Sequence, residues 1–235
     1  MSDKYPEFFN ALKNMGHNII PSDTVDTFLI PEQNHADMQI LMINNETFIL
    51  NECKTLKRKL ELINPTVCSK KVGKSYPENI LLNFLYFKNC LFGKAKYIDN
   101  SVKEFCKQNN IKIVNVNQGY CRCSTLVVSD NAVITADSSI EKALKNNGAE
   151  VLKISPGHIN LPGFDYGFIG GASGKIDKNT IVFFGNIQSH PDYRLIEAFC
   201  EKHNVKIKSL CINYPLTDIG SIVKINKLNK KAASQ

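Results

Sequence analysis

The sequence predicts an α/β protein of five ββαβ units, each a strand pair, a helix and a further strand, closed into a ring. The main observation is an Asn followed seven residues later by a small residue that opens an apolar strand. This spacing recurs at Asn117 to Ser124, Asn160 to Gly167 and Asn213 to Gly220. Such repeats determine the architecture, because one unit alone does not bury its apolar face.

Five helices are expected on the outside of the ring. Pro6 is suited to the first turn of a helix, where its missing N–H costs nothing, and Pro191 has the same role later in the chain. Ser101 with Glu104 and Ser138 with Glu141 match the capping box, in which the Ser accepts from a free amide. The expected helices span 6–16, 52–63, 101–109, 138–147 and 190–203.

Short β-rich segments lie between and after these helices. Two strand pairs contain turn residues, at Asn44-Asn45 and at Asp130-Asn131. The expected strands cover 17–20, 39–43, 47–50, 111–116, 126–129, 132–135, 150–154, 205–210 and 221–225. No stretch is long and polar enough to be a linker, so residues 1–235 are predicted to be one domain. The first helix, 6–16, has no strand pair before it and the last strand, 221–225, has no helix after it, so the two ends are expected to complete one unit.

The composition is typical of a chain that buries a core, because 43% of its 235 residues are hydrophobic and 22% are charged. No apolar run approaches the roughly 20 residues that cross a bilayer, and the first residues lack the pattern of a signal peptide. We therefore expect a cytoplasmic protein with no membrane partner. The net charge of +7 comes from dispersed lysines and a cluster at 226–231, which is more typical of a solvated tail than of a nucleic-acid site.

The eight cysteines contain no C-x-x-C pair, which argues against zinc sites and thioredoxin-like chemistry. In a reducing compartment most cysteines behave as small buried hydrophobic residues. We expect neither a metal nor an organic cofactor.

Equivalent positions at the entry to each unit's first strand should converge near the axis of the ring. Aligning the units on their turns and on the seven-residue spacing gives the equivalent triplets His35-Ala-Asp37, Asn79-Ile-Leu81, Cys121-Arg-Cys123, Phe164-Asp-Tyr166 and Thr217-Asp-Ile219. One mouth of the ring is therefore predicted to gather a thiol, an imidazole and several carboxylates, the groups that nucleophilic catalysis requires.

Five ββαβ units around a pseudo-fivefold axis resemble the pentein, or α/β-propeller, fold, and the resemblance covers nearly the whole chain. One group with this fold is the guanidino-modifying enzymes: arginine and agmatine deiminases, dimethylarginine hydrolases and amidinotransferases. A more distant group is the ribosome anti-association factors, which are non-catalytic rings of similar length.

Two motifs resemble those of the guanidino-modifying enzymes. His35-Ala-Asp37 is similar to their H-x-D, which implies His35 as acid and base and Asp37 as a grip on the guanidinium. The segment 119–125, Gly-Tyr-Cys-Arg-Cys-Ser-Thr, is similar to their G-G-x-H-C-x-T and implies Cys123 as nucleophile. Tyr120 and Arg122 stand where the family has Gly and His.

The resemblance implies a cysteine-dependent hydrolase or transferase acting on a small cationic guanidino or amidine compound. Asp165, Asp218, Asn79 and Arg122 are the candidate substrate-binding residues, and Arg122 is expected to lower a neighbouring thiol pKa if its side chain points inward.

Some alternatives stay open at this point. Cys121 or Cys211 is an alternative nucleophile. The alternative function is a non-catalytic ring that binds a macromolecular partner such as a ribosomal subunit or nucleic acid. The substrate, the choice between hydrolase and transferase, the retention of activity and the oligomeric state are left undetermined.

Overall fold

The protein, described by a computed structural model over residues 1–225, contains four repeats of a ββαβ unit. The first unit consists of β1 (Ile40–Ile43), β2 (Glu46–Ile49), α3 (Lys54–Lys59) and β3 (Thr66–Val67). The second consists of β4 (Leu85–Phe87), β5 (Cys90–Gly93), α4 (Asn100–Gln108) and β6 (Lys112–Asn115). The third consists of β7 (Thr125–Val127), β8 (Ala132–Thr135), α5 (Ser138–Asn146) and β9 (Glu150–Lys153). The fourth consists of β10 (Ser173–Asp177), β11 (Thr180–Asn186), α6 (Tyr193–Lys202) and β12 (Lys206–Pro215).

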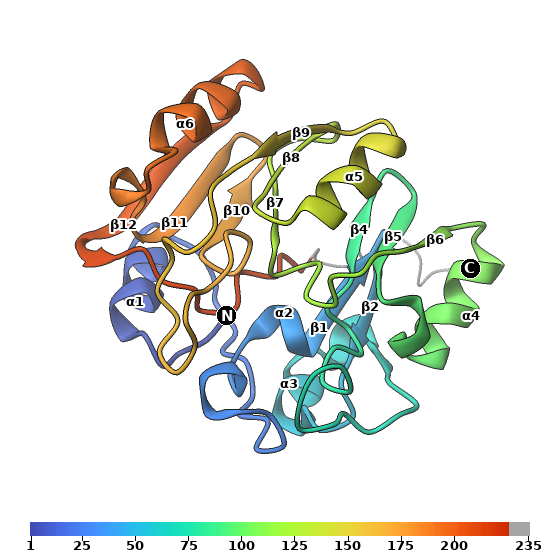
Figure 1. Ribbon diagram of the computed structural model, residues 1–235. Coiled ribbons are helices and arrows are strands. Elements are labelled where there is room, and N and C mark those ends of the chain that lie inside the picture. Colours follow the sequence, from blue (N-terminus) through green and yellow to red (C-terminus); the bar gives the residue numbers. More distant parts are fainter. Residues whose placement is uncertain (226–235) are drawn as a thin grey trace, which may run out of the picture.

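Every unit forms one three-stranded sheet with the same pairing. The second strand is central, antiparallel to the first and parallel to the third, as in β8 between β7 and β9. A parallel neighbour needs a crossover, and the helix of each unit supplies it. The sheets are set around a common centre with α3, α4, α5 and α6 on the outside (Figure 1).

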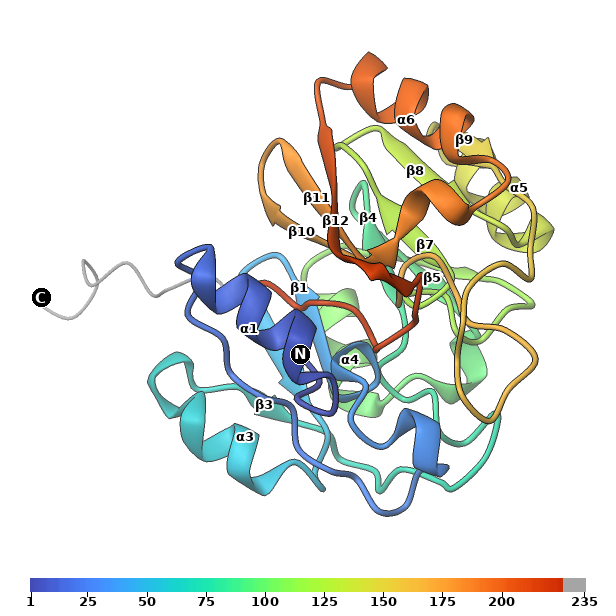
Figure 2. The same ribbon diagram turned by 90° about the vertical axis from the view of Figure 1, so that its left-hand side faces the viewer.

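The chain ends meet between the first and fourth units. The carbonyl of Gly220 accepts from Asp37 N at 3.1 Å, and the carbonyl of Gly171 accepts from Ser221 N at 2.9 Å. Helix α1 (Pro6–Asn14) shares a buried cluster with Ile219, and Figure 2 shows it beside the segment that follows β12. We propose that α1 and the segment 216–222 act as a fifth unit, and the single-domain organisation stays a prediction.

Gly220 is required at this closure. Its φ is +76°, and a Cβ there would lie 2.3 Å from His35 Cα.

Two expectations at the ends are wrong, because neither 17–20 nor 221–225 forms a strand. Backbone groups of the segment 218–221 instead form hydrogen bonds with the backbone of Asp37 and Gly171. The lysine-rich segment 226–231 lies outside the described residues.

Helices α1 and α5 begin at Pro6 and Ser138 as predicted, but the capping residues of α4 and α5 and the start of α6 differ from the prediction. The N-caps of α4 and α5 are Asp99 and Asp137, whose carboxylates accept from Ser101 N and Ser139 N, so the predicted capping boxes are wrong. A carboxylate is favoured there because it also complements the helix dipole. Pro191 precedes α6, which starts after Asp192. None of the helices in residues 1–225 is long and apolar enough to span a bilayer.

Candidate active site

A buried polar cluster lies where the units meet. It contains three carboxyl groups, one imidazole, one thiol and two amides, from Glu32, Asp37, Asp218, His35, Cys123, Asn79 and Asn83. The helical turns before β1, the turns before β4 and β7, and the closing segment 218–221 supply these side chains. The convergence predicted from the repeat therefore holds for His35, Asp37, Asn79, Cys123 and Asp218.

Cys123 is clamped by the side-chain amide of Asn83. Asn83 Nδ2 donates to Cys123 Sγ at 2.8 Å, while Asn83 Oδ1 accepts from the backbone N–H groups of Arg122 and Cys123 at 3.0 and 3.3 Å. Burial raises the pKa of the Cys123 thiol well above its usual value, and the charges of Asp37 and Asp218 raise it further. A lowered thiol pKa was expected only if Arg122 pointed inward, and that condition is not met, because the Arg122 side chain binds the Thr125 carbonyl and Ser221 Oγ.

Asp37 lies in the short helix α2 (Ala36–Gln39), directly before β1, and its side chain is fully buried. Neither carboxylate oxygen accepts a hydrogen bond from an N–H or O–H group of the described residues, and the donor close to it is the thiol of Cys123. The carboxylate is close enough to Cys123 to raise the thiol pKa. Burying a carboxylate with so few donors is costly, and a positive charge beside it would offset that cost.

His35 and Asp218 form a loose pair across the ring closure. His35 Nδ1 lies 3.9 Å from Asp218 Oδ1. Asp218 Oδ2 accepts from Phe168 N at 2.9 Å and Oδ1 accepts from Gly220 N at 3.0 Å. Burial raises the pKa of Asp218 to about 6, the charge of Asp37 adds to this rise, and a charged His35 opposes it. The pKa of Asp218 is therefore well above that of an ordinary aspartate.

Glu32 brings a third carboxyl group that the sequence analysis missed. Its Oε2 accepts from Asn79 Nδ2 at 3.1 Å, and the same nitrogen lies 2.8 Å from the Tyr120 hydroxyl oxygen. Burial raises the pKa of Glu32, while the hydrogen bonds of Tyr120 and Asn79 and the charge of His35 oppose the rise. The Asn79 side chain therefore binds Glu32 and Tyr120, and not the Cys123 thiol.

Four candidate residues do not join the cluster as expected. Asp165 is exposed on the long loop between β9 and β10. Arg122 is turned to the Thr125 carbonyl and to Ser221 Oγ, which it reaches at 3.3 and 3.2 Å. The remaining two are the alternative nucleophiles, Cys121, which packs in an apolar cluster, and Cys211, which lies in β12.

Asn83 was missed because the units were aligned on their turns. The turn between β4 and β5 is two residues long, at 88–89, whereas β7 and β8 are joined by the longer turn 128–131. Counting from the first strand instead, Asn83 precedes β4 by the same two positions as Cys123 precedes β7. Gly171 holds that position before β10, where a Cβ would lie 2.0 Å from Asp218 Oδ1.

This set of groups can perform nucleophilic substitution at a cationic carbon. Cys123 offers the nucleophile and His35 the acid and base, while Asp37 and Asp218 offer carboxylates for a planar cation. A guanidinium presents N–H donors in a fork that matches carboxylate oxygens. The clustering therefore favours chemistry on a cation over a passive structural role.

Comparison with solved structures identifies the architecture. A dimethylarginine dimethylaminohydrolase adduct has a TM-score of 0.57 at 8% identity, over 90% of this chain and 83% of that chain. A mutant of the same kind of enzyme from Pseudomonas aeruginosa, complexed with citrulline, has a TM-score of 0.54 at 8% identity, over 88% and 81%. An amidinotransferase from Microseira wollei has a TM-score of 0.52 at 12% identity, over 88% and 76%. These proteins are penteins, so the chain has the α/β pentein fold that the sequence predicts.

Comparison with curated proteins finds no match. A family model described as a family of unknown function, DUF6873, matches residues 1–223. That match extends from α1 to the closing segment and therefore includes the whole polar cluster. The chain belongs to the DUF6873 family.

Proposed function

We propose that the protein is a cysteine-dependent hydrolase or transferase acting on a small guanidino or amidine compound. Cys123 is the nucleophile, His35 the acid and base, and Asp37 and Asp218 hold the cation. Support comes from one observation above all, the fully buried carboxylate of Asp37, which lies beside the Cys123 thiol and accepts from no N–H or O–H group among the described residues.

A bound guanidinium would change the state of the thiol. Burial raises the pKa of Cys123 most, and the charges of Asp37 and Asp218 raise it further, so without a ligand the thiol holds its proton. A cation between them neutralises that effect and places a positive charge next to sulfur, which favours the thiolate. The nucleophile is then formed mainly when a cationic substrate is present.

The reaction follows from this arrangement. His35 removes the proton of the Cys123 thiol, and the thiolate attacks the central guanidinium carbon and forms a C–S bond. The protonated His35 then gives that proton to the departing amine as its C–N bond breaks. Water or an acceptor amine, deprotonated by His35, then attacks the same carbon and expels the thiolate. Water gives a hydrolase and an amine gives a transferase.

A thermal-shift and calorimetry screen tests the proposal, with arginine, agmatine, guanidinoacetate and methylated arginines as ligands. A binder should stabilise the wild type, and Asp37→Asn should weaken binding roughly 10- to 150-fold, the effect of losing one charge-assisted pair. Asp37→Asn should melt no lower than the wild type, because it removes a fully buried charge that accepts from no N–H or O–H group of the described residues.

Asp165→Asn is the matched control, since Asp165 is exposed and lies outside the cluster, and its ligand affinity should equal that of the wild type. If no guanidino compound stabilises the wild type, or if both variants bind equally well, the proposal is wrong. The alternative, a ring that binds a ribosomal subunit or nucleic acid, has no need of a buried thiol, imidazole and carboxylates. A cytoplasmic location stays a prediction.

A further inference from the structure

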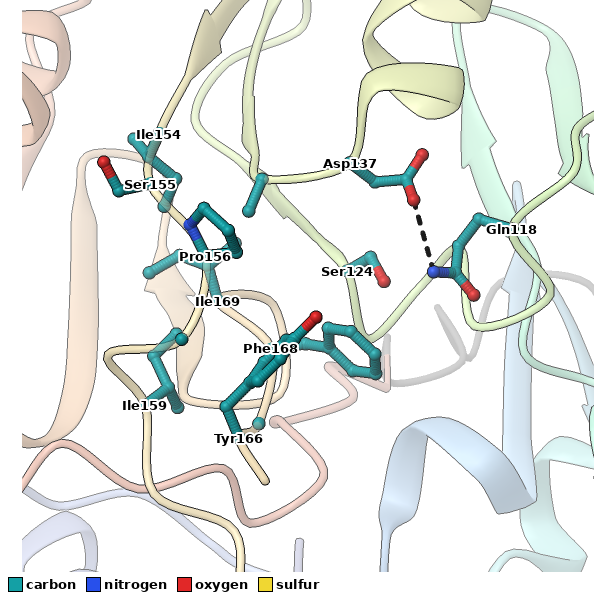
Figure 3. A pocket seen from close by; sticks show the side chains of 13 residues that line it. Gln118, Ser124, Asp137, Ile154, Ser155, Pro156, Ile159, Tyr166, Phe168 and Ile169 are labelled. Carbon is teal, nitrogen blue, oxygen red and sulfur yellow. Dashed lines mark hydrogen bonds between the residues drawn. The ribbon is translucent and has the colours of Figure 1, made fainter. Parts of the chain in front are cut away.

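A cavity lies between the third and fourth units, next to the polar cluster. Its volume is about 70 Å³, and Figure 3 shows the side chains that line it. Ser124, the residue after Cys123, is in its wall. Phe168 is also in the wall, and its backbone N–H donates to Asp218. The cavity is therefore a direct neighbour of the cluster, although the proposed function assigns it no role.

One side of the cavity is polar and carries a single charge. Gln118, Ser124 and Asp137 converge there (Figure 3). Asp137 Oδ1 accepts from Ser139 N and Ile140 N, but Oδ2 accepts only from Gln118 Nε2, at 3.3 Å. Oδ2 therefore has free lone pairs, and the hydrogen bonds at the start of α5 contribute to keeping the pKa of Asp137 below its usual value despite the opposing effect of burial.

Ser124 is a second, independent indication of a ligand. The residue is 3% exposed, and its Oγ has no hydrogen-bond partner among the described residues. A buried hydroxyl in this state is destabilising. Ser124 and Asp137 belong to the same wall, so a donor on this side of the cavity would lie near both residues (Figure 3).

The opposite side is apolar and suits a short hydrocarbon stem. Ile154, Pro156, Ile159 and Ile169 form it (Figure 3). An engineered apolar cavity of about 150 Å³ binds benzene, so a cavity about half that size fits a ligand of roughly four heavy atoms. Among the described residues no Lys or Arg lines the cavity, and Asp137 already takes the first amides of α5. An anionic group would therefore meet no positive charge from these residues and would lie against the Asp137 carboxylate.

We propose that this cavity binds a primary ammonium group on a short apolar stem, with the ammonium between Asp137 and Ser124 and the stem against Ile154 and Ile159. This site is separate from the carboxylates of Asp37 and Asp218 and does not depend on the proposed reaction.

Titrations of the ¹⁵N-labelled full chain test the site with three probes of similar shape: n-propylammonium, propan-1-ol and propionate. Propylammonium should shift the amide signals of Ser124, Gly167 and Ile169 saturably, with a dissociation constant at least roughly tenfold lower than that of propanol. Propionate should give no saturable shifts at these amides.

Asp137→Asn should lower the affinity for propylammonium roughly tenfold, to the level of propanol, because the amide still caps α5 but carries no charge. Asp99→Asn is the matched control, since Asp99 caps α4 in the same way and is not in the cavity wall, and it should bind like the wild type. Equal binding of propylammonium and propanol, no saturable shifts at the three amides, or equal losses in both variants would overturn the proposal.

Discussion

The raised pKa of Asp218 makes a specific contribution to the pH dependence of stability. Its ordinary pKa is 3.8, and in the folded protein burial raises it to about 6. Below pH 3.8 the carboxyl is protonated in both the folded and the unfolded state. Above pH 6 it is ionised in both states, and the folded state then holds a buried charge near Asp37. The contribution of Asp218 to stability is therefore fully present at low pH and is lost as the pH rises through 6.

The magnitude follows from the shift of about two units, which corresponds to about 3 kcal/mol at roughly 1.4 kcal/mol per unit. Urea unfolding of wild type and Asp218→Asn from pH 4 to pH 8 measures it. The free energy of unfolding of the wild type relative to the variant should fall by about 2 to 3 kcal/mol over this range, because a small part of the loss already occurs below pH 4. The amide also loses one acceptor for the N–H groups of Phe168 and Gly220, but that loss is the same at every pH.

If the difference in free energy of unfolding between the wild type and Asp218→Asn is the same at pH 4 and at pH 8, this reasoning is refuted, because Asp218 would then have an ordinary pKa.

The raised pKa of Asp218 also predicts that a guanidino ligand binds more weakly at pH 5 than at pH 7, since binding must first remove the proton from Asp218. Calorimetry at the two pH values measures this difference directly.

The other stability predictions concern the ring closure and the thiol clamp. Gly220→Ala should lower the free energy of unfolding by more than about 2 kcal/mol, because it adds a clash with His35 to an unfavourable φ. Gly157→Ala, where φ is +92° and the space is open, should lose only about 1 kcal/mol; similar losses in urea unfolding would contradict the closure. Asn83→Ala should lower stability by about 2–4 kcal/mol, since it leaves two buried amides and Cys123 without their partner. Asn83→Ala should also slow the alkylation of Cys123. If mass spectrometry finds the same rate of Cys123 labelling in the variant and the wild type, the clamp of Asn83 on the thiol is excluded.

Much of the fold could be predicted because the repeat appears in local patterns. Helix α5 and strand β8 were expected within one residue of their observed bounds, since each has a strong apolar period and a turn or cap beside it. Convergence of His35, Asp37, Cys123 and Asp218 followed from the repeat alone. Equivalent positions of two units are predicted correctly where both units have the same number of residues between that position and their first strand.

The remaining site residues depend on tertiary contacts that leave no local signal. The local sequence around Glu32 is typical of a turn, and Glu32 meets Asn79 only in the folded protein. Asp165 was predicted inward from the seven-residue spacing, but the long loop before β10 carries it to the surface, and Gly171 takes the inward position because Asp218 leaves no room for a side chain. Burial of Cys123, which sets its pKa, is likewise a property of the assembled ring.

The central claim is that Cys123 reacts with a cation held by Asp37 and Asp218. Two electrophiles of nearly the same shape test it, the cationic 2-chloroacetamidine and the neutral 2-chloroacetamide. The account predicts that the amidine labels Cys123 at least roughly tenfold faster than the amide, relative to their rates with a free thiol, because the cation is attracted to the carboxylates and lowers the thiol pKa.

The direct measurement is peptide mapping by mass spectrometry of the wild type and Asp37→Asn after timed exposure to each reagent at pH 7. In the wild type the amidine should modify Cys123 ahead of the other seven cysteines, and Asp37→Asn should remove most of its advantage over the amide. Equal labelling of Cys123 by the two reagents, or an amidine advantage that Asp37→Asn leaves unchanged, would contradict the account.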